Sequence, residues 1–189
     1  MTKFLFIEGG HGAGTSTHAD ALAAALRAQG IGARAYHHEP HPAGAVGLAR
    51  VVHYEATRRA LRHMAHERPR MDRPAAPEVI VCDRGPWSGL AYARSLEAQD
   101  TRRLDSGHHV AAAELALWWQ GTPVAYLDAS DATLDARLLL RGEDPAASHG
   151  ERAQWRRLAA AEGWPVIATD GDRDGVTRAL LTWALRVLA

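Results

Sequence analysis

The sequence predicts an α/β fold, a parallel sheet covered on both faces by helices, and three observations indicate it. Short apolar runs, such as residues 3–7 and 79–83, recur along the chain and have the length of buried strands. Stretches with alanine and leucine at helical spacing follow these runs. A glycine-rich segment joins the first run to the first of these stretches. Because strands and helices alternate throughout, a parallel sheet with helical crossovers is the expected architecture.

Local signals set the expected boundaries of these elements. Gly30 ends the first helix, and Pro40 disfavours helix at the residue before it, so a loop follows the second strand. The proline-rich segment 71–78 is a surface connection into the third strand. The expected strands are 3–7, 31–36, 79–83, 124–127 and 166–168. The expected helices are 16–29, 46–67, 88–99, 106–120, 132–140 and 151–161, with a loop at 142–150 and a closing helix that ends at 188.

Length and composition predict a single soluble domain over residues 1–189, long enough to bury a substantial core. The formal net charge is zero, so the composition indicates neither a nucleic-acid surface nor a membrane surface. No apolar run has the length that a bilayer needs, and the N-terminus turns acidic too soon for a signal peptide, so we expect a cytoplasmic protein. Cys82, the only cysteine, follows three β-branched residues and is expected in a buried strand.

The segment GGHGAGTST, residues 9–17, has nearly the pattern of a phosphate-binding loop. That pattern is glycine, four residues, glycine, lysine, then serine or threonine, and Thr15 stands in the lysine position. Such a turn aims backbone N–H groups and a helix N-terminus at phosphate oxygens without help from the lysine. Ser16 stands where the motif's hydroxyl coordinates Mg²⁺. The expected phosphate-binding residues are Gly9, Gly12, Ala13, Gly14, Thr15, Ser16 and Thr17.

The missing lysine should affect chemistry more than binding. The lysine of the motif neutralises phosphate charge during transfer, whereas threonine offers only a neutral hydroxyl. Lys3 is the only lysine of the chain, and at about 3.3 Å per strand residue it lies roughly 20 Å from Gly9 along the first strand. Positive charge at this loop must therefore come from arginine.

Several separated stretches resemble the thymidylate kinases within the nucleoside monophosphate kinases. Residues 6–17 resemble that family's opening, FIEGxDGAGKST. His-Glu-Pro at 38–40 stands where the family has Arg-Glu-Pro, and YEATR at 54–58 resembles its FAADR. The best match is DRGPWSGLAY at 83–92, which resembles DRYxxSxxAY. Residues 126–142 contain a Tyr-Leu-Asp strand end and two arginines that resemble the approach to the family's lid.

The resemblance implies a three-layer P-loop NTPase fold with five parallel strands flanked by helices and a short lid at about 141–151. It implies a donor ATP with Mg²⁺ on the loop, an acceptor monophosphate opposite, and a possible homodimer. Arg84 would hold the acceptor phosphate, and Asp83 would help to organise Mg²⁺. The other expected acceptor-binding residues are Glu39, Tyr54, which would stack on the base, Arg58, which would read the base edge, and Tyr92, which would lie beneath the sugar.

A kinase is the first functional hypothesis. Phosphoryl transfer from Mg-ATP to a nucleotide or nucleoside-like small molecule would use arginine charge in place of the missing lysine. Arg84, Arg137 and Arg141 are the expected sources, because an arginine fork pairs two phosphate oxygens. Arg137 and Arg141 are four residues apart, so we expect both to project from one helical face, as lid arginines do.

The departures from the family pattern fall on ligand-facing positions. His11 replaces the acid of the loop, and His37 and His38 stand where an arginine would face the acceptor phosphate. Gly89 replaces an amide that reads the base, and residues 144–150 lack the usual Asp-Arg pair. The core-forming stretches remain intact, which suggests a retained scaffold with a changed ligand or reaction.

Two alternatives follow from these departures. One is a phosphohydrolase that cleaves a nucleoside monophosphate with water positioned by Glu8, His11 or Asp83, because hydrolysis needs a base more than it needs ATP. The other is a nucleotide-binding protein without catalysis. The histidine groups have no zinc-ligand spacing, so Mg²⁺ is the only metal expected, with Ser16 and Asp83 nearest to it.

Overall fold

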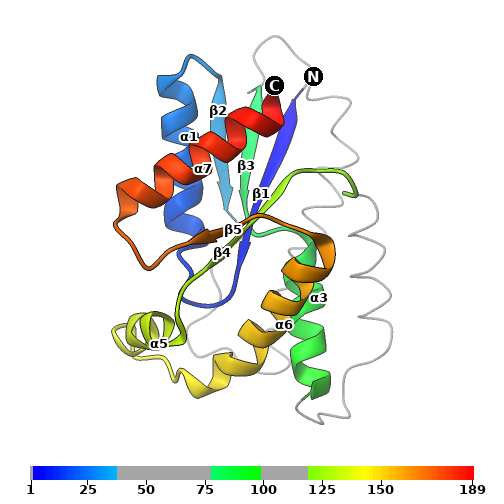
Figure 1. Ribbon diagram of the computed structural model, residues 1–189, viewed down its shortest axis with the longest axis vertical. Helices are drawn as coiled ribbons and strands as arrows, with labels where there is room; N and C mark the ends of the chain where they lie inside the picture. Colours follow the sequence, from blue (N-terminus) through cyan, green and yellow to red (C-terminus); the bar gives the residue numbers. More distant parts are fainter. Residues whose placement is uncertain (1, 38–77, 99–118) are drawn as a thin grey trace.

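The described part of the chain is built on one five-stranded sheet (Figure 1). The structure is a computed structural model that describes residues 2–37, 78–98 and 119–189. The strands lie in the order β2-β3-β1-β4-β5, and every neighbouring pair is parallel. All five expected strands and their parallel arrangement are therefore confirmed. The strands are β1 (Lys3–Gly9), β2 (Ala33–His37), β3 (Val79–Asp83), β4 (Val124–Asp128) and β5 (Val166–Ala168).

The central strand β1 is apolar on both sides because both faces of the sheet are covered. Leu5 and Ile7 pack in the core on one face, whereas Phe4 and Phe6 pack in the core on the other. All four side chains are buried, which is typical of a parallel strand between two helical layers. Cys82 is buried in the second core, so the expectation of a core cysteine in a buried strand is confirmed, and burial raises the pKa of its thiol.

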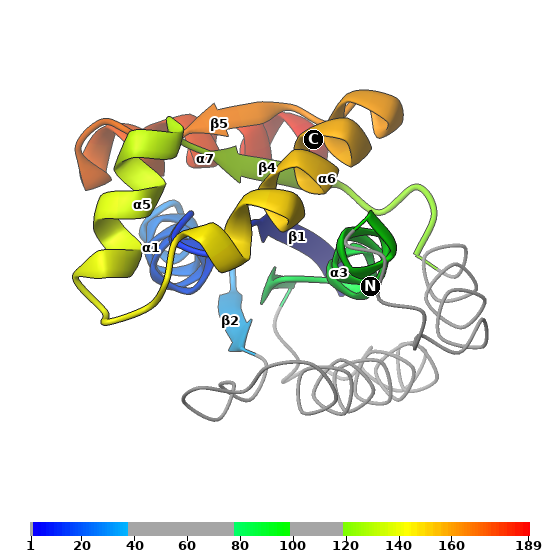
Figure 2. The same cartoon turned by 90° about the horizontal axis from the view of Figure 1, so that it is seen from below.

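The helices divide between the two faces of the sheet. Helices α1 and α7 contribute to the core beneath Leu5 and Ile7, and α3 and α6 contribute to the opposite core (Figure 2). The expected boundaries of the described helices agree closely with the observed ones, apart from the start of α6. The described helices are α1 (Thr15–Ala28), α3 (Pro86–Ala98), α5 (Asp131–Leu139), α6 (Ala146–Glu162) and α7 (Arg173–Leu188).

Helix α6 begins earlier than the sequence indicates, so the predicted loop at 142–150 is confirmed over 142–145 and wrong over 146–150. Asp144 accepts a hydrogen bond from the backbone N–H of Ala146 at 3.0 Å, and the helix continues from there through Gly150. Its first turns bury Ser148 and Glu151. Tertiary packing thus overrides the glycine and the polar composition that suggested a loop. The irregular part of the expected lid shrinks to the turn between α5 and α6.

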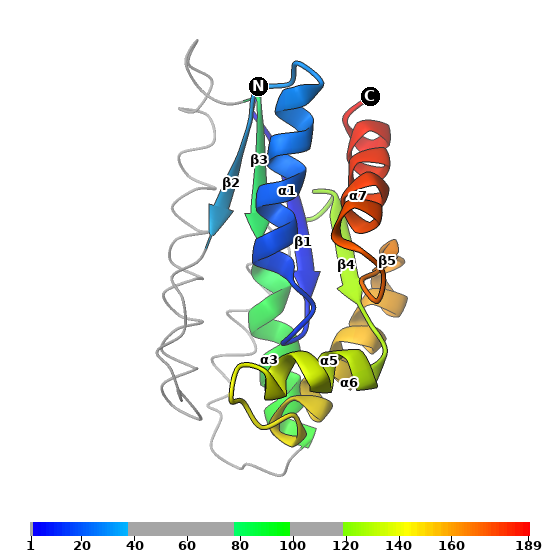
Figure 3. The same cartoon turned by 90° about the vertical axis from the view of Figure 1, so that its left-hand side faces the viewer.

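Helix α5 lies across the end of the sheet at which β1 and β4 finish (Figure 3). Ser130 caps it by accepting a hydrogen bond from the N–H of Thr133.

The expected helix at 46–67 and almost all of the one at 106–120 lie outside the described residues, as do Glu39, Tyr54 and Arg58.

None of the helices in residues 2–37, 78–98 and 119–189 is both long enough and apolar enough to cross a membrane.

Candidate functional site

The glycine loop occupies the turn between the carboxyl end of β1 and the start of α1. Gly12 and Gly14 have φ values of 85° and 86°, a conformation that side chains with a Cβ rarely adopt. Gly9 has a different reason to be glycine, because a Cβ there would lie 2.9 Å from the Cβ of Ala13 and 3.0 Å from the carbonyl oxygen of Leu127. Conformation and space therefore both require the glycines that the motif predicts.

The loop places the N-terminus of α1 at the carboxyl edge of the sheet. The first intrahelical bond runs from the N–H of His18 to the carbonyl oxygen of Gly14, so the N–H groups of residues 15–17 have no partner within the helix. No side chain caps Gly14 within the part of the chain that the structure describes, and the first turn of α1 contains no acidic residue. An anion is the ligand that such a helix start favours.

Thr15 packs inside the loop instead of projecting from it. Its side chain is only 5% exposed, and its Cγ2 lies 3.1 Å from the position that a Cβ on Gly9 would take. Ser16 and Thr17 are exposed in the first turn of α1, where hydroxyls can reach a ligand. Lys3 donates a hydrogen bond to the carbonyl oxygen of Leu188, at the opposite end of β1, so it does not serve the loop.

Arg137 supports the backbone of the loop. Its Nη1 donates to the carbonyl oxygen of Gly12 at 3.1 Å and to Oγ1 of Thr169 at 3.2 Å, and its Nη2 donates to the carbonyl oxygen of Thr169. This guanidinium therefore ties the loop to the residue after β5. Arg141 is exposed and lies in the turn after α5, which ends at Leu139, so the prediction that both arginines share one helical face is wrong. The helix ends at Leu139 and the chain forms a turn over residues 140–142, so Arg141 does not lie on α5.

Glu8 lies beneath the loop as a fully buried carboxyl group. It is 0% exposed, and Oγ of Ser88 donates a hydrogen bond of 2.8 Å to its Oε2. Burial raises the pKa of Glu8 to about 8, although the Ser88 hydrogen bond and the charge of Arg84 act in the opposite direction. Glu8 therefore holds a proton at neutral pH, which disfavours it as the base of the hydrolytic alternative.

Close packing at the end of β3 fixes the group around Glu8. A Cβ on Gly85 would lie 2.5 Å from Cδ1 of Phe6 and 2.8 Å from Oε1 of Glu8, so this position has room for glycine alone. Arg84, the residue before it, has a φ of 67°, which is rare for a residue with a side chain. The strained backbone directs the chain sharply from β3 into α3, and Asp83 and Arg84 stand at that bend beside the first strand.

Asp83 ends β3 and is paired in register with His37 of β2. It is 6% exposed, and its Oδ2 lies 3.3 Å from Nδ1 of His37. The other ring nitrogen, Nε2, lies 2.9 Å from Oδ1 of Asp20 on α1. The sequence places Asp83 correctly at the site edge, but it gives no sign that His37 contacts it.

His11 and Arg84 meet a carboxylate that the sequence does not single out. Nε2 of His11 lies 3.7 Å from Oε2 of Glu151, and Nη1 of Arg84 lies 4.0 Å from Oε1 of the same residue. Nδ1 of His11 lies 3.7 Å from Oε2 of Glu143 in the α5–α6 turn. The loop histidine and the strand-end arginine are thus brought together by α6. Glu151 is buried there, whereas the sequence pattern suggested only a helix start.

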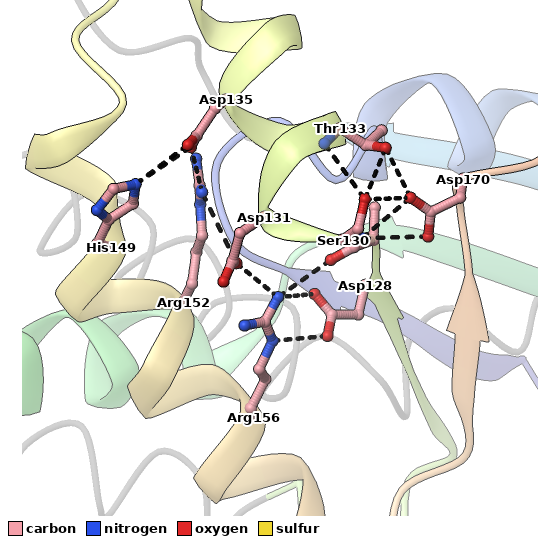
Figure 4. Close-up of polar contacts among 10 residues, drawn as sticks. Asp128, Ser130, Asp131, Thr133, Asp135, His149, Arg152, Arg156 and Asp170 are labelled. Atoms are coloured by element: carbon pink, nitrogen blue, oxygen red, sulfur yellow. Dashed lines mark hydrogen bonds and ion pairs between the residues drawn. The ribbon is translucent and has the colours of Figure 1, made fainter.

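Helix α6 is joined to α5 and β4 by a set of ion pairs, here called the arginine clasp (Figure 4). Nε of Arg156 donates to Oδ2 of Asp128 at 2.8 Å, and its Nη2 donates to Asp131 at 2.8 Å. Nη1 of Arg152 donates to Asp135. The clasp consists of Asp128, Asp131, Asp135, His149, Arg152 and Arg156, and its two arginines are one helical turn apart.

The clasp holds α5 and α6 against the outer side of the glycine loop. A Cβ on Gly12 would lie 3.3 Å from the carbonyl oxygen of Leu134 on α5, and one on Gly10 would lie 3.4 Å from Cγ of Arg152 on α6. Arg152 is 2% exposed, and its Nε and Nη2 have no hydrogen-bond partner within the described residues. The loop is therefore enclosed by packed helices on the side away from α1.

The two residues expected to bind Mg²⁺ lie on neighbouring elements of the structure. Ser16 lies in the first turn of α1 and Asp83 ends β3, so both expected metal-binding residues stand at the loop end of the sheet. Among the described residues, no three histidine, cysteine, aspartate or glutamate side chains are grouped so as to hold a metal ion. Tyr92 is part of α3.

No protein-family model matches the sequence, and no curated protein matches it.

Proposed function

We propose that this chain is a phosphotransferase with a P-loop type of fold, which binds a nucleoside triphosphate on the glycine loop. The reaction moves the terminal phosphoryl group to a nucleotide or nucleoside-like acceptor. The observation that carries the proposal is the loop itself: Gly12 and Gly14 adopt positive φ and leave the start of α1 uncapped in the described part of the chain. The order of the five parallel strands supports it, because ligands bind at the carboxyl ends of such strands.

The residues around the glycine loop have different roles in the proposed reaction. The N–H of Ala13 donates to the carbonyl oxygen of Gly10, so the backbone N–H groups of Gly12 and of residues 14–16 bind phosphate oxygens. Arg137 keeps the loop in shape through the Gly12 carbonyl oxygen. Arg84, at the bend after β3, takes the acceptor phosphate. Ser16 and Asp83 would hold Mg²⁺, which neutralises phosphate charge when it is bound. Thr15 adds no charge, so transfer is slower than in a loop with lysine.

Calorimetric titration with ATP and Mg²⁺ tests the loop, with a pair of glycine variants as the internal comparison. Gly14 and Gly30 both have positive φ, at 86° and 79°, so Gly14→Ala and Gly30→Ala carry a similar backbone penalty of about 1 kcal/mol. Only Gly14 belongs to the loop. We expect Gly14→Ala to lose ATP affinity at least tenfold and Gly30→Ala to retain it. Equal affinity in both variants, or no binding by the native chain, would refute the proposal.

Labelled ATP incubated with a panel of nucleosides and monophosphates tests the reaction. A labelled acceptor supports the kinase. Phosphate released from a monophosphate without any triphosphate identifies the hydrolase, and ATP binding without either product identifies the non-catalytic protein. Thr15→Lys tests whether the missing lysine explains the lack of either product. If the missing charge limits the reaction, this substitution should raise the rate of phosphoryl transfer. The buried position of Thr15 means that the folding of this variant must be checked by circular dichroism.

A further inference from the structure

A carboxylate–imidazole–carboxylate chain crosses from α1 to β3 next to the glycine loop. His37, the last residue of β2, has Nε2 at 2.9 Å from Oδ1 of Asp20 and Nδ1 at 3.3 Å from Oδ2 of Asp83. Asp20 is 63% exposed, whereas Asp83 is buried, so the chain leads from solvent to the site. The strand register places His37 directly beside Asp83 and fixes this contact.

The two contacts favour the protonated form of the ring. A neutral imidazole has one N–H, so it can donate to only one carboxylate, whereas an imidazolium can donate to both. The hydrogen bonds and charges of Asp20 and Asp83 raise the pKa of His37 overall, although partial burial, the largest single influence, lowers it. Glu8 stands near Asp83 but keeps its own proton at neutral pH. Asp20 and Asp83 are therefore the anions that act on the ring among the described residues.

We propose that His37 is a positioning residue that, braced by Asp20, holds Asp83 in one orientation at the phosphoryl-transfer site. Its bond to Oδ2 leaves Oδ1 of Asp83, which is buried and has no hydrogen-bond partner within residues 2–37, 78–98 and 119–189, as the oxygen that accepts from a ligand, a metal-bound water or an acceptor hydroxyl. This inference rests on the proposed function. Asp20 acts at a distance from the ligand, through its contact with the histidine.

Asp20→Asn is the sharpest perturbation, because it removes the outer charge and leaves both residues at the site unchanged. Asp174→Asn on α7 is the matched control, since it makes the same change at another exposed aspartate. Nitrogen-15 NMR of the imidazoles, with His37 assigned through His37→Gln, reports protonation and tautomer directly. We expect Nδ1 of His37 to carry a proton that is hydrogen-bonded to Asp83 in the native chain, and Asp20→Asn to change the nitrogen-15 shift of Nε2.

The transfer assay supplies the second readout. Asp20→Asn should lower kcat for transfer about threefold to tenfold and leave the KM for ATP unchanged, whereas Asp174→Asn should match the native chain. A His37 whose Nδ1 carries no proton, or the same kcat in Asp20→Asn and Asp174→Asn, overturns the inference. If the native chain transfers no phosphate to any acceptor, the proposed function and the role of Asp83 in it both fail, whereas the NMR result still decides whether the hydrogen-bonded chain exists.

Discussion

Replacing Glu8 with glutamine should change the stability of the protein in a pH-dependent way. The carboxyl pKa is raised from 4.5 to about 8 by burial, so the folded protein keeps a proton that the unfolded chain releases above pH 4.5. The native stability therefore falls as pH rises through this range, by about 1.4 kcal/mol for each pH unit. Between pH 5 and pH 7 the total is about 3 kcal/mol. Glutamine has the same shape and no proton to lose, so Glu8→Gln does not undergo this fall.

Urea unfolding of both proteins at pH 5, 6, 7 and 8 measures the effect. The difference in unfolding free energy, Glu8→Gln minus native, should increase by about 3 kcal/mol from pH 5 to pH 7 and level off above pH 8. Taking the difference removes the contributions of His37 and other groups that titrate equally in both proteins. Glu162→Gln, at an exposed position on α6, serves as the control and should follow the native curve. If the two curves for Glu8→Gln and native protein stay parallel, the buried carboxyl group is not protonated at neutral pH and the reasoning is refuted.

Three further substitutions test the packing and the ion pairs. Gly85→Ala places a Cβ 2.5 Å from Cδ1 of Phe6 and should lower the urea unfolding free energy by about 1–3 kcal/mol; an unchanged midpoint would show that the ring can move. Arg137→Met keeps the stem but removes the bonds to loop and strand end, so the protein should lose about 1–3 kcal/mol and bind ATP more weakly by calorimetry. Arg156→Ala opens the clasp at Asp128 and should cost about 1 kcal/mol at low salt; an equal cost in 1 M NaCl would exclude an electrostatic origin.

The strands and the glycine loop could be predicted because their signals are local. A buried parallel strand must be apolar on both faces, so an uninterrupted apolar run such as residues 79–83 marks it without knowledge of its neighbours. Positive φ at Gly12 and Gly14 likewise depends on the residues themselves. These local rules give the sheet, the loop and the place of Asp83 and Ser16 at the end of the sheet.

The rest of the site depends on contacts between residues far apart in the sequence. The pairing of Arg156 with Asp128 spans 28 residues, and that of His37 with Asp83 spans 46. Each of these charges would equally suit a solvated surface, so nothing in the sequence distinguishes them. Gly150 and the polar residues around it suggested a loop, but the buried Glu151 and its neighbours hold them in a helix.

The bonds of Arg137 have a consequence for the kinetics of ligand capture. Because one guanidinium links the first turn of the chain to the segment after its last strand, these two connections are fastened to each other before any ligand arrives. A surface whose shape is set in advance loses little conformational entropy on association, so binding should be rapid and limited by encounter. The same hydrogen bonds connect Thr169, which is distant in sequence, with the turn where the first strand meets the first helix.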